Sequence, residues 1–250
     1  MKTDVISLTD DPQVTLTAYL LDQSPELSNA AVRPAVLIFP GGAYSICSDR
    51  EAEPVAMAYL AQGYHAFVLR YSLGKKAAFP RPLNDAETAL AWIREHAEEC
   101  GVAPGKIAVC GFSAGGHLAA ALGTMGRVRP DAMILGYPCI LGEMGKALNL
   151  TIPSCEQQVD EKTPPAFLFS TYSDEVVPIR NSLSFADALE QNHIPFEIHI
   201  FQEGPHGLSL ARDLTSSGLK RYVNPDVSKW LDLSVCWLRK RFGGFACENS

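Results

Sequence analysis

Short runs of apolar residues recur along the chain and alternate with longer stretches of amphipathic pattern. Residues 35–39 are all apolar and lie between Pro34 and Pro40, which is typical of a strand buried on both faces. Similar runs predict further strands, at residues 66–70, 107–110, 132–137, 166–171 and 196–201. Two earlier runs, at residues 5–8 and 14–20, alternate polar and apolar positions and predict antiparallel strands at the start of the chain.

Helical patterns separate these runs. Apolar residues recur at helical spacing, or Ala and Leu dominate, at residues 53–62, 83–100, 113–123, 179–191 and 226–241. Asn84 or Asp85 is a candidate N-cap for the second of these helices. Strands that alternate with helices of this length pair in parallel through crossover connections. The pattern therefore predicts an α/β fold with a mostly parallel sheet of about eight strands and helices on both faces.

Length and charge fit one such domain and exclude one class of partner. The chain has 250 residues, of which 47% are hydrophobic and 20% are charged. Because single α/β domains of about 200–250 residues are common, we expect one domain over residues 1–250. The net charge is −7, from 21 Lys and Arg against 28 Asp and Glu. Phosphate backbones are repelled by such a surface, so nucleic acid is not an expected partner.

The cysteines and the N-terminal stretch bear on the cellular location of the protein. The seven cysteines are scattered without a C-x-x-C motif or a zinc-type spacing, which is typical of reduced thiols. The first 17 residues contain Asp4, Asp10 and Asp11 and lack the apolar core of a signal peptide. No apolar run in the sequence approaches 18 residues. We therefore expect a cytoplasmic protein without a membrane partner.

The candidate chemistry centres on Gly111-Phe-Ser-Ala-Gly115, which matches the motif G-x-S-x-G. A predicted buried strand enters the motif and an Ala- and Leu-rich helix leaves it, which is the context that the motif requires. Such a turn holds the serine hydroxyl clear of the backbone, and the two glycines remove Cβ atoms that would collide with the flanking elements. Ser113 is therefore the predicted nucleophile.

A serine nucleophile needs a base, and the base needs an acid that orients it. In a strand–helix fold with this motif the chain order is serine, acid, histidine, and active-site groups follow the carboxyl ends of the strands. Among six histidines, His206 meets both conditions, because it follows the strand predicted at residues 196–201. His117 lies one turn into the helix after Ser113, and we expect it to be packed inside the protein.

Asp174 is the preferred acid. Asp174 and Glu175 both follow the strand predicted at residues 166–171, at the correct edge of the sheet. We prefer Asp174 because a short carboxylate at that turn can reach the Nδ1 atom of His206. Glu143, which follows the preceding strand, is the alternative.

The negative charge of a tetrahedral intermediate needs backbone N–H donors. One donor belongs to the residue after the nucleophile, Ala114. The others should come from the loop after an early strand, where Pro40-Gly-Gly-Ala-Tyr44 lies. Glycines let this loop turn its N–H groups inward and let an acyl oxygen approach.

Together these stretches resemble the α/β-hydrolase superfamily. Within it they resemble the esterases related to hormone-sensitive lipase, in the branch of endo-1,4-xylanase-B-like proteins and acetyl-xylan or feruloyl esterases. The likeness spans about residues 34–208 and rests on residues 40–44, 79–85, 111–119, 164–169, 173–178 and 204–207. Many members of this branch act on acetyl groups of carbohydrates, so the resemblance implies an acetylesterase.

The resemblance also assigns site residues. It implies a triad and a set of oxyanion donors, namely Ser113, Asp174 and His206, with Gly42, Ala43 and Ala114. The family's oxyanion motif is often His-Gly-Gly-Gly, whereas Pro40 and Ala43 stand at its two ends here. Backbone donors survive such changes, and the Ala43 methyl group is expected to narrow the acyl side of the site.

The sequence thus predicts a serine carboxylesterase that acts on a small-molecule, short-chain ester and needs no metal or organic cofactor. An arylformamidase and a small-peptide hydrolase use the same machinery and remain alternatives, as does an inactive hydrolase that serves as a binding module. The sequence does not determine the oligomeric state, and a homo-oligomer is one of the options. Residues 139–163 are expected to form a small cap. That stretch is too short for a lid domain, which predicts a shallow, partly open pocket and short acyl groups.

Overall fold

A computed structural model describes residues 1–247 of the chain. Its sheet, within these residues, has eight strands in the order β1-β2-β4-β3-β5-β6-β7-β8. The strands are β1 Lys2–Ser7, β2 Thr15–Leu20, β3 Arg33–Phe39, β4 His65–Arg70, β5 Val102–Phe112, β6 Ala132–Gly136, β7 Ala166–Thr171 and β8 Phe196–Phe201. β1 and β2 pair antiparallel with each other, and β2 pairs antiparallel with β4, whereas all other pairs are parallel. The predicted mostly parallel α/β sheet is confirmed.

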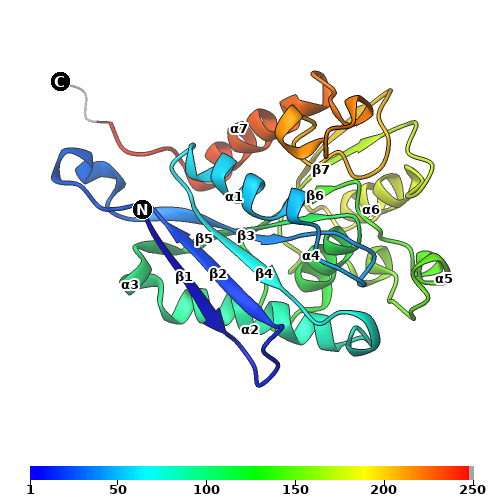
Figure 1. The fold of residues 1–250 in the computed structure, drawn as a ribbon, viewed down its shortest axis with the longest axis horizontal. Helices are drawn as coiled ribbons and strands as arrows, with labels where there is room; N and C mark the ends of the chain where they lie inside the picture. The colour runs from blue at the N-terminus through cyan, green and yellow to red at the C-terminus, as the bar shows by residue number, and fades with distance from the viewer. Residues whose placement is uncertain (248–250) are drawn as a thin grey trace.

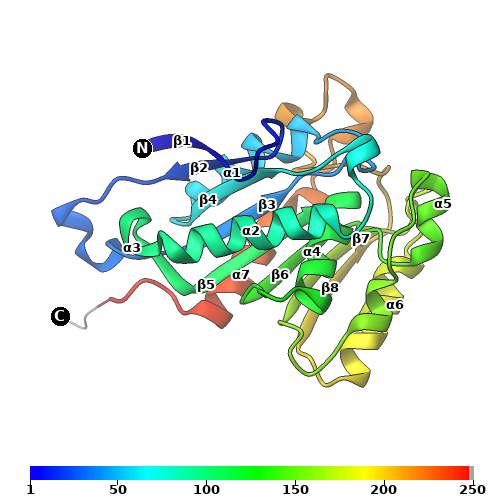
Figure 2. The same cartoon turned by 90° about the horizontal axis from the view of Figure 1, so that it is seen from below.

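Helices cover both faces of the sheet (Figures 1 and 2). They are α1 Glu53–Leu60, α2 Arg81–Glu95, α3 Ala97–Cys100, α4 Ala114–Met125, α5 Gly145–Leu148, α6 Arg180–Gln191 and α7 Trp230–Phe242. α1 and α7 pack on one face, and α2, α4 and α6 pack on the other. None of the helices within residues 1–247 has both the length and the apolar composition needed to cross a bilayer.

Two hydrophobic clusters, one on each face, account for the all-apolar strands. In β3, Ala35, Leu37 and Phe39 belong to the cluster under α2 and α4, whereas Val36 and Ile38 belong to the cluster under α1 and α7. Successive side chains of a strand point to opposite faces, so a strand covered on both faces needs an apolar residue at every position. This is the physical reason that the continuous apolar runs were correct predictors of strands.

The second predicted helix is wrong in its bounds. The predicted stretch 83–100 is two helices, α2 and α3, which are separated by a non-helical His96 (φ −102°, ψ 17°). α2 begins at Arg81, and Pro82 in its first turn has the backbone angle that a helix start requires. Asp85 is inside α2 and accepts a hydrogen bond from the Ser72 N–H at 2.8 Å instead of capping the helix.

The last predicted helix also begins later than expected. Within residues 226–241, Val227–Lys229 form a 3₁₀ turn, and α7 begins at Trp230.

The sheet topology brings the segments that follow β3, β5, β6, β7 and β8 to one edge, because these strands are parallel. The candidate site lies at this carboxyl edge.

Candidate active site

Ser113 sits on a tight turn between β5 and α4. β5 ends at Phe112, α4 begins at Ala114, and Ser113 between them has φ 52° and ψ −117°. An L-residue rarely adopts a positive φ, and such backbone strain persists only where surrounding contacts hold it. Here the Ser113 N–H donates to the Gly136 carbonyl oxygen at 3.0 Å, and the Ser113 carbonyl oxygen accepts from the N–H groups of His117 and Cys139, each at 3.0 Å. These contacts fix the direction of the hydroxyl.

The two glycines of the motif let the backbones of strand, turn and helix approach closely. A Cβ atom on Gly111 would lie 2.2 Å from the Gly115 carbonyl oxygen. A Cβ atom on Gly115 would lie 2.1 Å from the carbonyl oxygen of Phe39, at the end of β3. Both distances are far below van der Waals contact, so each position requires glycine for packing.

We expect Gly115→Ala to destabilise the fold strongly, because the clashing oxygen belongs to the backbone of a central strand. Overpacking a core costs about 1–3 kcal/mol, and a clash with immobile backbone should reach or exceed the upper end of that range. Urea denaturation would measure the loss as a lower midpoint. Gly105→Ala, in β5, is the matched control, because no atom lies within 4 Å of its added Cβ, and its midpoint should not change. Equal midpoints for Gly115→Ala and the wild type would contradict the prediction.

The structure brings Ser113, His206 and Asp174 together from three different loops. The Nε2 atom of His206 lies 2.8 Å from the Ser113 hydroxyl oxygen. The Nδ1 atom of the same ring lies 2.7 Å from Oδ2 of Asp174. Each residue follows the carboxyl end of a parallel strand, namely β5, β7 and β8. The ring therefore stands between a hydroxyl and a carboxylate, as a base and its orienting acid require.

The orientation of Asp174 is fixed by its second oxygen. Oδ1 accepts hydrogen bonds from the N–H groups of Val176 and Val177, both at 2.9 Å. The side chain is only 1% exposed. Oδ2 therefore points at His206 and has little freedom to turn elsewhere.

The alternative acids lie away from the histidine. Glu143 is half exposed and forms an ion pair with Arg180. Glu175 is exposed. The preferred residue, Asp174, is thus the carboxylate that contacts His206.

Two further polar groups near the serine have structural roles. His117 is fully buried, with Nδ1 at 2.8 Å from the Tyr44 hydroxyl and Nε2 at 3.0 Å from the Pro153 carbonyl oxygen, as expected for a packed histidine. Burial lowers the pKa of His117 to about 4, so the ring is neutral at neutral pH. Cys139 lines the same cavity as Ser113, but burial raises the pKa of its thiol to about 12. A protonated thiol is a poor nucleophile, so Ser113 remains the candidate nucleophile of this cavity.

The loop after β3 lines the same cavity as the serine and contains two backbone N–H groups without a protein partner in the described part of the chain. Gly42 and Ala43 both line the cavity with Ser113 and have positive φ angles of 129° and 56°. Within residues 1–247, neither N–H donates a hydrogen bond to another protein group. The Ala114 N–H is the first of α4, and the first N–H groups of a helix have no partner inside it. These N–H groups are therefore the candidate donors to an oxyanion at Ser113.

The cavity above Ser113 has a volume of about 380 Å³. Its walls are mostly apolar and come from four loops at the carboxyl edge. Besides Ser113, His206, Gly42 and Ala43, the lining residues include Ile46, Cys139, Met144, Ala147, Leu148, Val176, Val177 and Tyr222. Ile46 and Val176 are 62% and 61% exposed, which places them at an open rim. The stretch 139–163, expected to form a small cap, contributes four of these residues.

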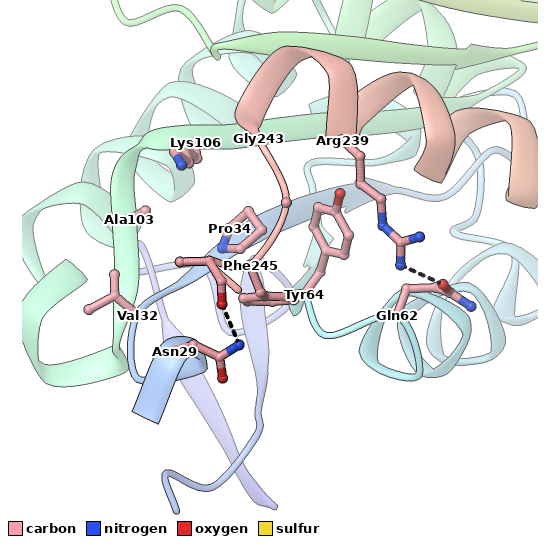
Figure 3. Close-up of a pocket in the computed structure, with 12 residues that line it drawn as sticks. Asn29, Val32, Pro34, Gln62, Tyr64, Ala103, Lys106, Arg239, Gly243 and Phe245 are labelled. Carbon is pink, nitrogen blue, oxygen red and sulfur yellow. Dashed lines mark hydrogen bonds between the residues drawn. The ribbon is translucent and has the colours of Figure 1, made fainter. Parts of the chain in front are cut away.

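A second cavity, of about 300 Å³, lies at the opposite edge of the sheet (Figure 3). Tyr64, Lys106 and Arg239 line it, and Phe245 from the stretch after α7 forms part of one wall. It contains none of the three residues that the carboxyl edge brings together. Two of these three residues, Ser113 and His206, line the first cavity.

The sequence did not point to three residues that surround the site. Glu51 and Arg50 line the cavity from the segment before α1, and the ring of Tyr137 packs edge-on against the ring of His206, with 5.1 Å between the ring centres. None of these residues belongs to a local motif. The sequence places these residues in segments that follow strands, at the carboxyl edge of the sheet. Many other polar residues share that position, so it does not single them out.

Two family models match the chain. The model described as BD-FAE matches residues 23–137, which include Ser113. The model of the prolyl oligopeptidase family matches residues 151–223, which include Asp174 and His206. The chain is also 30% identical over 226 residues to an acetylxylan esterase of Xylanibacter ruminicola, in a match that covers 81% of this chain and 45% of that protein. The chain thus spans less than half the length of this curated relative.

Solved structures match over nearly the whole chain. MGS-M1, an α/β hydrolase enzyme from a Medee basin deep-sea metagenome library, has a TM-score of 0.92 and 48% identity, and the match covers 96% of this chain and 97% of that one. The carboxylesterase Cest-2923 from Lactobacillus plantarum WCFS1 has a TM-score of 0.90 and 30% identity, covering 99% and 100% of the two chains. The chain belongs to the α/β-hydrolase superfamily, among its esterases.

Proposed function

We propose that this chain is a serine carboxylesterase for short-chain, acetyl-type esters, with Ser113, His206 and Asp174 as its catalytic triad. The observation that carries the proposal is the continuous contact from the Ser113 hydroxyl through the His206 ring to the Asp174 carboxylate, at 2.8 Å and 2.7 Å. Hydrogen-bond distances of this kind allow proton transfer between nucleophile and base.

In the first half of the reaction, Ser113 Oγ attacks the ester carbonyl carbon while its proton passes to His206 Nε2. The carbonyl oxygen becomes an oxyanion, which accepts hydrogen bonds from the N–H groups of Ala114 and of Gly42 or Ala43. Asp174 stabilises the imidazolium through Nδ1 and does not itself take up the proton. The intermediate collapses as its C–O bond to the alcohol breaks, and His206 returns the proton to the departing alcohol.

In the second half, water attacks the acyl group on Ser113. The proton of the water passes to His206, and a second oxyanion forms in the same place. Cleavage of the bond to Ser113 Oγ releases the carboxylic acid and returns the proton to the serine. These steps use side chains, backbone N–H groups and water.

The size of the cavity supports a small substrate. Sites for drug-sized ligands usually measure about 300–1,000 Å³, and this one is near the lower end. Its rim is open at Ile46 and Val176, so a long acyl chain would extend into water without further burial. The acetylxylan esterase relative supports O-acetylated carbohydrates as the natural class, with the sugar at the open rim.

A substrate panel tests this proposal. We expect kcat/KM for p-nitrophenyl acetate and butyrate to equal or exceed that for the decanoate ester, since methylenes that extend past the open rim into water add no binding free energy. Acetate release from acetylated xylo-oligosaccharides would support the carbohydrate class. Preference for esters longer than about eight carbons would overturn the short-chain proposal. Faster turnover of N-formylkynurenine than of these esters would favour the arylformamidase. Faster turnover of a proline peptide anilide would favour the small-peptide hydrolase.

A further inference from the structure

Glu51 is a buried carboxylate close to the triad that the proposed mechanism does not use. It is 4% exposed and lies in the segment between β3 and α1, directly below the cavity that contains Ser113. Carboxylates are almost never fully buried unless they are paired or hydrogen-bonded, so its contacts require an explanation. Burial raises the pKa of Glu51, an effect that hydrogen bonds from its neighbours oppose.

Each oxygen of Glu51 accepts a hydrogen bond from a different part of the site. Oε2 accepts from the N–H of Gly41 at 2.8 Å. Gly41 begins the oxyanion loop, here residues 41–44, and immediately precedes the proposed donors. Oε1 accepts from the hydroxyl of Tyr137 at 2.6 Å. Both partners donate, and an ionised carboxylate, whose oxygens only accept, satisfies both contacts at once.

Tyr137 extends this contact to the histidine loop, here residues 202–211. Its hydroxyl oxygen accepts a hydrogen bond from the Ser209 N–H at 2.8 Å, three residues after His206. Its ring packs edge-on against the imidazole of His206. Tyr137 and Ser209 are both buried, so water cannot replace these hydrogen bonds. One chain of hydrogen bonds therefore runs from the oxyanion loop through Glu51 and Tyr137 to the histidine loop.

The residue before Glu51 provides a second link to the same loop. The guanidinium of Arg50 donates to the Gly207 carbonyl oxygen at 2.7 Å and to the Thr215 carbonyl oxygen at 2.5 Å. The Arg50 carbonyl oxygen accepts from the Ser209 hydroxyl at 2.5 Å. The segment before α1 is thus held against the histidine loop by both the side chain and the carbonyl oxygen of Arg50, directly before Glu51, which leaves the carboxylate little freedom to follow one partner alone.

We infer that Glu51 is a positioning residue that sets the distance between the oxyanion donors and His206. This inference rests on the proposed esterase mechanism, in which backbone N–H groups must stabilise the oxyanion while His206 accepts the serine proton. Within residues 1–247 no hydrogen bond joins Glu51 to Ser113, His206 or Asp174, and its two oxygens accept from Gly41 and Tyr137. It acts through these two partners.

Glu51→Gln tests the inference, because an amide offers only one acceptor oxygen. If that oxygen faces Gly41, the amide NH₂ leaves the Tyr137 hydroxyl proton without an acceptor. If it faces Tyr137, the amide NH₂ meets the Gly41 N–H, and two donors oppose each other. Either arrangement shifts one loop relative to the other. We expect kcat for p-nitrophenyl acetate to fall by about 10- to 100-fold, since a displacement of about 1 Å in an active site costs up to that much, while KM changes by less than about threefold.

Tyr137→Phe, which keeps the ring against His206, should lower kcat by a similar factor. The double variant should lose no more than the larger single loss, because both changes break one chain of hydrogen bonds. Glu53→Gln is the matched control, an exposed glutamate two residues away, and should retain wild-type kcat.

Active sites are counted by the endpoint of fluorophosphonate labelling, so that kcat refers only to folded, competent enzyme. Glu51→Gln with wild-type kcat per labelled site, even if the variant is less stable, would overturn the positioning role. A strictly additive loss in the double variant would also contradict it. Failure of the proposed function is a separate result, in which the wild-type protein itself neither reacts with the label nor hydrolyses any ester of the panel.

Discussion

Ser113→Ala is expected to lower kcat for p-nitrophenyl acetate by about 10⁴- to 10⁶-fold, because triad members act as a unit and the substitution removes the attacking oxygen. The backbone of the turn should persist, since the hydrogen bonds that hold residue 113 involve its N–H and carbonyl groups rather than its hydroxyl. Stability by urea denaturation should therefore stay close to that of the wild type. The loss measures chemistry rather than folding.

A fluorophosphonate probe gives the same prediction a second readout. The probe should add once to the wild type, on the peptide that contains Ser113, and should not add to Ser113→Ala. Ser228→Ala is the control, because among residues 1–247 its hydroxyl donates one hydrogen bond, to the nearby Pro225 carbonyl oxygen, and it lies outside the cavity. It should retain full labelling and full activity. A label on another serine, or a Ser113→Ala variant with more than about 1% of wild-type kcat, would contradict Ser113 as nucleophile.

The fold and the contact among Ser113, His206 and Asp174 could be predicted from sequence because each depends on a local or a topological rule. β3 is apolar at every position since it is covered on both faces. Gly111 and Gly115 flank the serine since neighbouring backbone leaves no room for a Cβ atom. Asp174 and His206 follow strands whose carboxyl ends share one edge with that of β5. Chain order then restricts the candidates to a few residues.

The helix boundaries depend on tertiary contacts that the local pattern does not contain. Asp85 is a residue type favoured at N-caps. In the folded chain its carboxylate instead accepts a hydrogen bond from the N–H of Ser72, in the segment after β4. The break at His96 accompanies stacking of its ring on Trp92, with 4.2 Å between the ring centres. Ser72 lies 13 residues before Asp85, so helical periodicity does not indicate this partner, whereas Trp92 and His96 are neighbours four residues apart.

Glu51 shows a stronger form of the same limit. It stands in a stretch with Asp49 and Glu53, and nothing in the local sequence separates these three carboxylates. Its distinguishing contact is with Tyr137, 86 residues later in the chain. The two meet because β3 and β6 lie on either side of β5 in the sheet, and only the assembled sheet brings the segments after them together.

Asp174→Asn is expected to lower kcat by about 10⁴-fold at neutral pH, with little change in stability. The N–H groups of Val176 and Val177 both point at Oδ1, so the amide oxygen of the asparagine must occupy that position. The amide NH₂ then takes the place of Oδ2 and donates to Nδ1 of His206. The proton of the neutral ring is thereby moved to Nε2, which faces the Ser113 hydroxyl and can no longer accept its proton.

Glu143→Gln separates this account from the alternative choice of acid. Glu143 is half exposed and pairs with Arg180 on the surface, so its substitution should leave kcat within about twofold of the wild type. Steady-state kinetics of both variants on p-nitrophenyl acetate would decide between the two carboxylates. A large loss in Glu143→Gln with near-normal Asp174→Asn would reverse the assignment. Because the two valine N–H groups fix which way the asparagine amide turns, the size of the Asp174→Asn loss reports directly on the protonation of Nε2.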